Sequence, residues 1–120
     1  MAESVTALYR PVGRKELELI RNLEFKAFPP RLPEQPFFYP VLSEEYAIQI
    51  ARDWNTKDES SGYEGYVLTS RVRSSFLSRY KTHVVGSAVH REYWIPASDL
   101  GEMNQNIVGL IEITARFQGQ

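Results

Sequence analysis

The chain has 120 residues, of which 42% are hydrophobic, and this is enough for one folded domain with a core. Its net charge of -1 argues against a general nucleic-acid binder, because such proteins neutralise phosphates with an excess of Lys and Arg. The sequence contains no Cys, which excludes disulfides, a thiol nucleophile and a thiolate metal site.

Targeting and metal signals are also missing from the sequence. The N-terminal residues MAESVTALYR show neither the charged nor the apolar part of a signal peptide, and no apolar run is long enough to cross a bilayer. The two histidines, His83 and His90, are a poor metal motif. We therefore expect a cytoplasmic protein without a membrane or metal partner.

The first part of the chain predicts a strand, a helix and a long loop. Val5 to Val12 has strand composition, and Pro11 should end this strand or confine it to an edge. Residues 14–25 have apolar residues at roughly helical spacing among charged ones. Four prolines fall between Pro29 and Pro36, so this segment is expected to be an extended loop that crosses the domain.

The clearest helix is predicted over residues 43–55, directly after a short strand at Phe37 to Val41. Ser43 is a good N-cap, and acidic residues fill the first turn, where the helix dipole favours them. One buried face is expected from the residues at helical spacing, which are Ala47, Ile50, Ala51 and Trp54. The polar residues 56–65 predict a flexible loop.

The remainder of the chain is mostly strand. Residues 66–75 predict a strand with Tyr66, Leu68 and Val72 on one face. Residues 76–80 predict a helical turn, 81–85 and 90–96 predict strands, and a short helix should begin at Ala97 or Ser98. Residues 107–117 predict a closing strand whose inward-facing residues are Ile111, Ile113, Ala115 and Phe117. This order indicates an α+β fold with small mixed or antiparallel sheets and two to three helices.

Three side chains at strand ends could carry chemistry. Arg10 can clamp an anion through its planar fork, although a solvated arginine is the commoner role of such a residue. Tyr39 can stack on a flat ring, although aromatic residues in short strands usually pack in a core. Glu92 can steady a developing positive charge at a sugar, or it can be an outward-facing solvated residue.

A local basic patch is the fourth candidate. Arg31 lies in the proline-rich loop, and Arg71 and Arg73 lie on one face of a strand. Together they could bind a nucleotide diphosphate or a nucleic-acid substrate, whereas charges on a solvated face are the commoner explanation. No glycine-rich loop joins a strand to a helix, so a P-loop and a Rossmann fingerprint are both excluded.

Three segments of the chain together resemble a known group. LYRPVGRKELELI, FPPRLPEQPFFYPVLSEEYAIQIARDW and EYWIPASDLGEMNQNIVGLIEI look like short bacterial proteins labelled "ADP-ribosylation/crystallin J-type". The hydrolases of that name are much longer, all-helical and magnesium-dependent, and this chain lacks their length and acid clusters. The layout is instead similar to the toxin-type ADP-ribosyltransferase fold, and it implies a single domain of this type over residues 1–120 with a split β-sandwich.

The resemblance implies an NAD-consuming enzyme. Arg10 would contact the diphosphate or ribose of NAD, Tyr39 would line the nicotinamide pocket, and Arg31 and Tyr93 would complete the cofactor contacts. Glu92 would be catalytic: it would hydrogen-bond the ribose and stabilise the oxocarbenium-like centre as nicotinamide leaves. The acceptor of ADP-ribose, whether protein, nucleic acid or small molecule, is not specified by the sequence.

An alternative hypothesis is a catalytically inactive module of the same fold. Pro40 and Val41 follow Tyr39 where many transferases have an apolar residue and then Thr or Ser, and His90 stands where a second Glu is common. Such a module would bind a nucleotide, a peptide or a partner chain through an aromatic-rich cleft formed by Tyr39, Tyr66, Tyr93 and Trp94.

Overall fold

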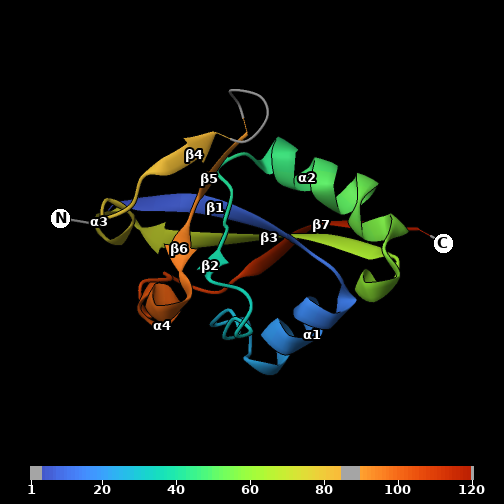
Figure 1. Cartoon of the computed structure of the whole chain (residues 1–120), viewed down its shortest axis with the longest axis horizontal. Helices are drawn as coiled ribbons and strands as arrows, with labels where there is room; N and C mark the ends of the chain where they lie inside the picture. The colour runs from blue at the N-terminus through green and yellow to red at the C-terminus, as the bar shows by residue number, and fades with distance from the viewer. Residues whose placement is uncertain (1–3, 85–89, 120) are drawn as a thin grey trace.

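The centre of the protein is a three-stranded antiparallel sheet. A computed structural model describes residues 4–84 and 90–119, and its strands β1 (Val5–Val12), β3 (Glu64–Arg73) and β7 (Glu112–Gln118) form this sheet with β3 in the middle (Figure 1). Val5 pairs with Arg73 at one end of β1 and Val12 pairs with Tyr66 at the other, so β1 and β3 match along the full length of β1. The predicted α+β class with antiparallel strands is confirmed.

Residues 40–42 extend this sheet beyond β1 and join it to a small ribbon. Tyr9 and Val41 exchange two backbone hydrogen bonds of 2.8 Å, and Val41 also bridges to Glu92. Glu92 belongs to β5 (Arg91–Tyr93), which pairs with β4 (Thr82–Val84). Further along, β2 (Phe37–Phe38) pairs with β6 (Ile95–Pro96), so residues 37–42 run antiparallel to residues 91–96.

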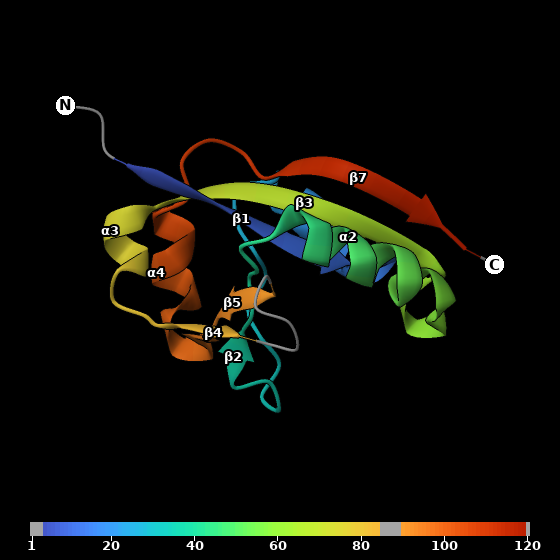
Figure 2. The same cartoon turned by 90° about the horizontal axis from the view of Figure 1, so that it is seen from above.

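Helices cover the two faces of the sheet unequally. The helix α2 (Glu44–Asp53) lies on one face, whereas α1 (Arg14–Asn22) and α4 (Leu100–Gln105) lie on the other (Figures 1 and 2). The short α3 (Ser74–Leu77) follows β3, and three 3₁₀ turns occupy residues 55–57, 59–61 and 97–99. As predicted, Ser43 caps α2: its side chain accepts a hydrogen bond of 3.2 Å from the Tyr46 amide.

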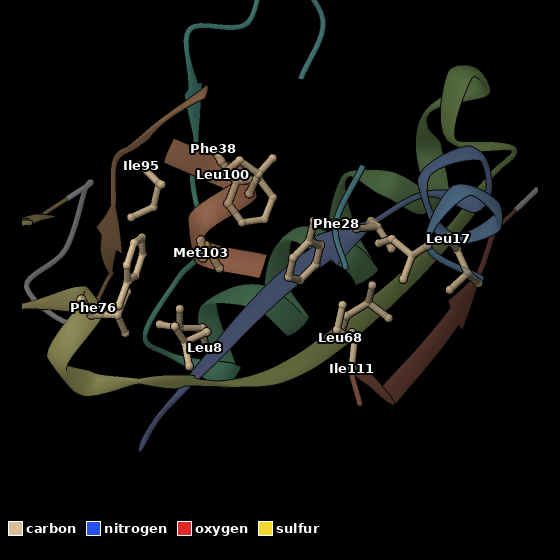
Figure 3. Packing of buried hydrophobic residues seen from close by; sticks show 14 residues of the cluster. Leu8, Leu17, Phe28, Phe38, Leu68, Phe76, Ile95, Leu100, Met103 and Ile111 are labelled. Carbon is tan, nitrogen blue, oxygen red and sulfur yellow. The ribbon is translucent and has the colours of Figure 1, made fainter. Parts of the chain in front are cut away.

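Two apolar clusters follow from this arrangement. The larger one lies between the sheet and the elements α1, α3, α4 and β6, and Figure 3 shows the packing of its side chains. Leu8, Phe38, Ile95 and Met103 belong to it and are at most 1% exposed. The smaller cluster lies under α2 and contains Val41, Ala47, Ala51 and Val67.

Two expectations about side-chain direction are wrong. Trp54 directly follows α2 and is 72% exposed, and Ile50 is only half-buried, so the predicted buried face is reduced to Ala47 and Ala51. The last strand does not point all its apolar residues to one side, because the pairing with β3 shifts between Val67 and Leu68. This bulge sends Ile113 to the larger cluster, whereas Ala115 and Phe117, which the alternation had placed with it, pack under α2.

Candidate functional site: an aromatic surface beside Glu92

The side chain of Glu92 lies on the α2 face of the sheet. Tyr9, Val41 and Glu92 are directly opposite one another on neighbouring strands, so their side chains point to the same face. Val41 and Tyr9 pack in the cluster under α2, which identifies that face. The Glu92 carboxylate also acts on Tyr46 of α2: burial raises the pKa of the Tyr46 phenol, and the negative charge of Glu92 raises it further.

Four ring side chains gather next to Glu92. We call them the aromatic platform; they are Phe37, Tyr39, His83 and Trp94. The ring centres of Phe37, Tyr39 and Trp94 are 5.9–6.2 Å apart, and His83 stacks on Trp94 at 3.9 Å. The Trp94 indole donates a hydrogen bond of 3.0 Å to Oε1 of Glu92, which ties the carboxylate to the rim of the platform.

The rings of the platform are packed against each other, and two of them are partly exposed. Aromatic rings at these centre distances are in mutual contact, so no further ring fits between them. Tyr39 and Trp94 are nevertheless 36% and 39% exposed. The platform is therefore an apolar surface bordered by a carboxylate, and it is not a slot for a planar ligand.

Arg10 is on the other face of the sheet. It follows Tyr9 directly in β1 and so points to the opposite side, where its guanidinium stands 4.4 Å from the ring centre of Phe38. Both oxygens of Glu16 accept hydrogen bonds from Arg10, at 2.5 Å from Nε and 2.9 Å from Nη2. These two hydrogen bonds engage the guanidinium of Arg10, which the sequence had suggested as an anion-binding group.

Arg31 lies near Arg10 and is half-buried. Its Nε donates a hydrogen bond of 3.0 Å to the carbonyl of Phe37, and its guanidinium stands 5.7 Å from the ring centre of Phe38. Burial lowers the pKa of Arg31, and the positive charge of Arg10 lowers it further. The guanidinium groups of Arg10 and Arg31 thus both lie over the ring of Phe38.

The structure brings together only part of the predicted site. Tyr39 and Glu92 both neighbour Trp94 on one side of the sheet, whereas Arg10 lies on the other side. Tyr93 is half-buried and packs against the larger cluster, as does Tyr66, whose hydroxyl donates a hydrogen bond of 2.5 Å to Glu64. Neither tyrosine belongs to the platform.

Sequence reasoning missed two members of the platform and the partner of Arg10. Phe37 could have been found, because it is two residues from Tyr39 in a strand and therefore shares its face. His83 enters through the pairing of β4 with β5, opposite Glu92, and no local signal shows this pairing. Glu16 is six residues from Arg10 across a strand-to-helix junction, where neither strand nor helix periodicity predicts a contact.

Neither a metal cluster nor a membrane-spanning helix is found in the described part of the chain. Within residues 4–84 and 90–119, no group of three or more His, Asp or Glu side chains is placed to hold a metal ion. In the same residues, no helix has the length and apolar character needed to cross a bilayer. No model of a protein family matches this chain, and no curated protein matches it either.

Proposed function

We propose that this protein is a binding module that captures a partner protein through the aromatic platform, without catalysis of its own. The observation that carries the proposal is the mutually packed set of rings at Phe37, Tyr39 and Trp94, of which Tyr39 and Trp94 are exposed, with the Glu92 carboxylate at its rim. Exposed Trp and Tyr side chains dominate the binding energy of many protein interfaces, because they bury a large area and lose little conformational entropy.

The chemistry of the rim indicates what the partner should present. Oε1 of Glu92 accepts the Trp94 indole, and no donor from the described residues reaches its second oxygen. A Lys or Arg of the partner could pair with this oxygen while a neighbouring apolar side chain covers the rings. We therefore expect a peptide segment in which an apolar residue adjoins a basic one.

Selection from a displayed peptide library tests this proposal. Peptides are enriched on the wild-type protein and then measured against Trp94→Ala and against Trp54→Ala, a matched control because Trp54 is exposed but lies outside the platform. We expect apolar-basic sequences whose affinity falls at least tenfold in Trp94→Ala and is unchanged in Trp54→Ala. Equal binding to the wild type and to Trp94→Ala would refute the proposal.

ADP-ribosyl transfer from NAD to an unknown acceptor is the second candidate for the same surface. The observation in its favour is the half-buried carboxylate of Glu92, which is held by the Trp94 indole and has one oxygen left for a ribose hydroxyl. In this candidate Glu92 is the catalytic residue, and Tyr39 contacts the nicotinamide ring.

An NAD titration followed by an assay of nicotinamide release separates the two candidates. A transferase should bind NAD and release nicotinamide slowly, and Glu92→Gln should abolish the release while NAD affinity is retained. A binding module should release no nicotinamide. Absence of NAD binding at millimolar concentration would count against transfer and leave the module as the proposal.

A further inference from the structure

A pocket on the opposite side of the sheet from Glu92 is used by neither candidate. It has a volume of about 580 Å³ and lies between the end of β1, the start of α1, the proline-rich segment and the 3₁₀ turns of residues 55–61. Pockets of this size are typical of sites for small molecules. Its lining is mixed: Leu19, Leu32 and the two prolines Pro29 and Pro30 are apolar, whereas Lys15 and Arg31 are cationic.

Arg31 is the unusual group in this lining. Its only hydrogen bond among the described residues runs from Nε to the Phe37 carbonyl, so both terminal nitrogens of its fork have no acceptor there. No carboxylate of the described chain forms an ion pair with it. A half-buried guanidinium of this kind is ready to accept a bidentate anion.

The negative charge of Glu16 acts on Arg31 from a distance, but the hydrogen bonds of this carboxylate go to another residue. Glu16 gives both its oxygens to Arg10. Arg10 and Arg31 lie over the same Phe38 ring, which lines the pocket, so two positive charges stand beside one negative charge there. One positive charge is left over. Lys15 and Asp58 also line the pocket and their opposite charges balance, while the Asp58 carboxylate is held by hydrogen bonds from Ser60 and Ser61.

The apolar part of the lining indicates the body of the ligand. Leu19 and Leu32 are 44% and 58% exposed, although both line the pocket. A ligand with a compact apolar body would cover them, and each methylene-sized group removed from water favours binding. An inorganic ion would leave these side chains exposed.

We propose that this pocket binds a small organic anion, in which a carboxylate or phosphate monoester pairs with the terminal nitrogens of Arg31 and a compact apolar body contacts Leu19 and Leu32. The proposal does not depend on the aromatic platform or on NAD. It assigns Arg31 the role of an anion receptor and Arg10 the role of a structural partner of Glu16.

Binding of three matched probes tests this site on the full chain. Phenyl phosphate, benzoate and neutral benzamide have the same ring and differ in charge, and their affinities can be measured by NMR titration in a buffer of low chloride concentration. We expect both anions to bind at least tenfold more tightly than benzamide and to shift the backbone signals of residues around Arg31 and Leu32. Inorganic phosphate should bind more weakly than phenyl phosphate.

Substitutions then identify the receptor. Arg31→Gln should weaken the binding of both anions at least tenfold, whereas Arg116→Gln, at an exposed arginine of β7, should leave it unchanged. If Arg31→Gln does not fold, Lys15→Gln tests the positive potential of the pocket at an exposed side chain. We expect it to weaken the binding of both anions about threefold. Equal affinities for benzoate and benzamide, or no effect of Arg31→Gln in a folded protein, would overturn the proposal.

Discussion

The pair formed by Arg10 and Glu16 should be a main electrostatic contribution to stability, and Glu16→Gln tests this directly. The side chains of Arg10 and Glu16 are only 13% and 26% exposed, and two hydrogen bonds join them. Replacement of the carboxylate by an amide keeps the shape and one possible acceptor. It removes the charge, so the guanidinium of Arg10 stays largely buried between Phe38 and a neutral group.

The size of the effect follows from the burial of the pair. Breaking a fully buried ion pair costs about 3–5 kcal/mol, and an exposed pair is worth about 0–1 kcal/mol. Since the pair between Arg10 and Glu16 is closer to the buried limit and the amide keeps part of the hydrogen bonding, we expect a loss of about 2 kcal/mol in the free energy of unfolding. For a chain of this length that corresponds to a melting temperature lower by roughly 6–10 °C.

Urea unfolding at pH 7 measures this change, with Glu24→Gln as the matched control. Glu24 also forms an ion pair, with Lys26, but the two side chains are 74% and 68% exposed. We expect Glu24→Gln to leave the unfolding midpoint unchanged within error. If both substitutions have the same effect, or if Glu16→Gln costs less than about 0.5 kcal/mol, the pair does not hold Arg10 in the way described.

Two further predictions concern titration and packing. Burial and a hydrogen bond of 2.8 Å to Asp99 raise the pKa of Tyr80 from 10 to about 12, so its phenol should ionise last in an absorbance titration. The unfolded chain loses the Tyr80 proton at a lower pH than the folded protein does. The protonated phenol therefore stabilises the folded protein fully below pH 10, and this contribution is lost as the pH rises towards 12. Tyr80→Phe should remove this part of the pH dependence of the free energy of unfolding. Gly65→Ala should cost about 2–3 kcal/mol in urea unfolding, because strain from overpacking has this size. The added Cβ would stand 2.1 Å from the backbone oxygen of Ala51, whereas a Cβ at Gly101 meets nothing within 4 Å, so Gly101→Ala is the control and should not destabilise.

Local signals in the sequence predicted the elements well. The cap at Ser43, the acidic first turn of α2, the strand composition of β1 and the apolar alternation of β3 depend on neighbours within a few residues, and the structure has these elements close to the expected positions. The exposed Trp54 shows the limit of such signals. It fits the helical spacing of the buried face, but the chain leaves α2 at this residue and turns into a 3₁₀ segment, and the indole is left largely exposed.

The parts of the site that the sequence did not predict depend on long-range pairing. Whether two side chains on different strands share a face is decided by register, and a shift of one residue reverses it. Arg10 and Glu92 are each credible functional residues on their own strand, but only the pairing of Tyr9 with Val41, and of Val41 with Glu92, shows that they point apart. The bulge in the last strand is a further case, since one extra residue redirects Ala115 and Phe117.

The separation of Arg10 from Glu92 is fixed by the core and has a consequence for any chemistry at Glu92. To bring Arg10 to the Glu92 side, β1 would have to slip by one residue, which would turn Leu8 and Val12, now 1% and 2% exposed, out of the larger cluster. Exposure of two such side chains costs roughly 3–6 kcal/mol, a large part of the stability of a domain of this size. Nicotinamide release, if the NAD assay detects it, should therefore depend on groups of the α2 face next to Glu92 and persist in a folded Arg10→Gln variant.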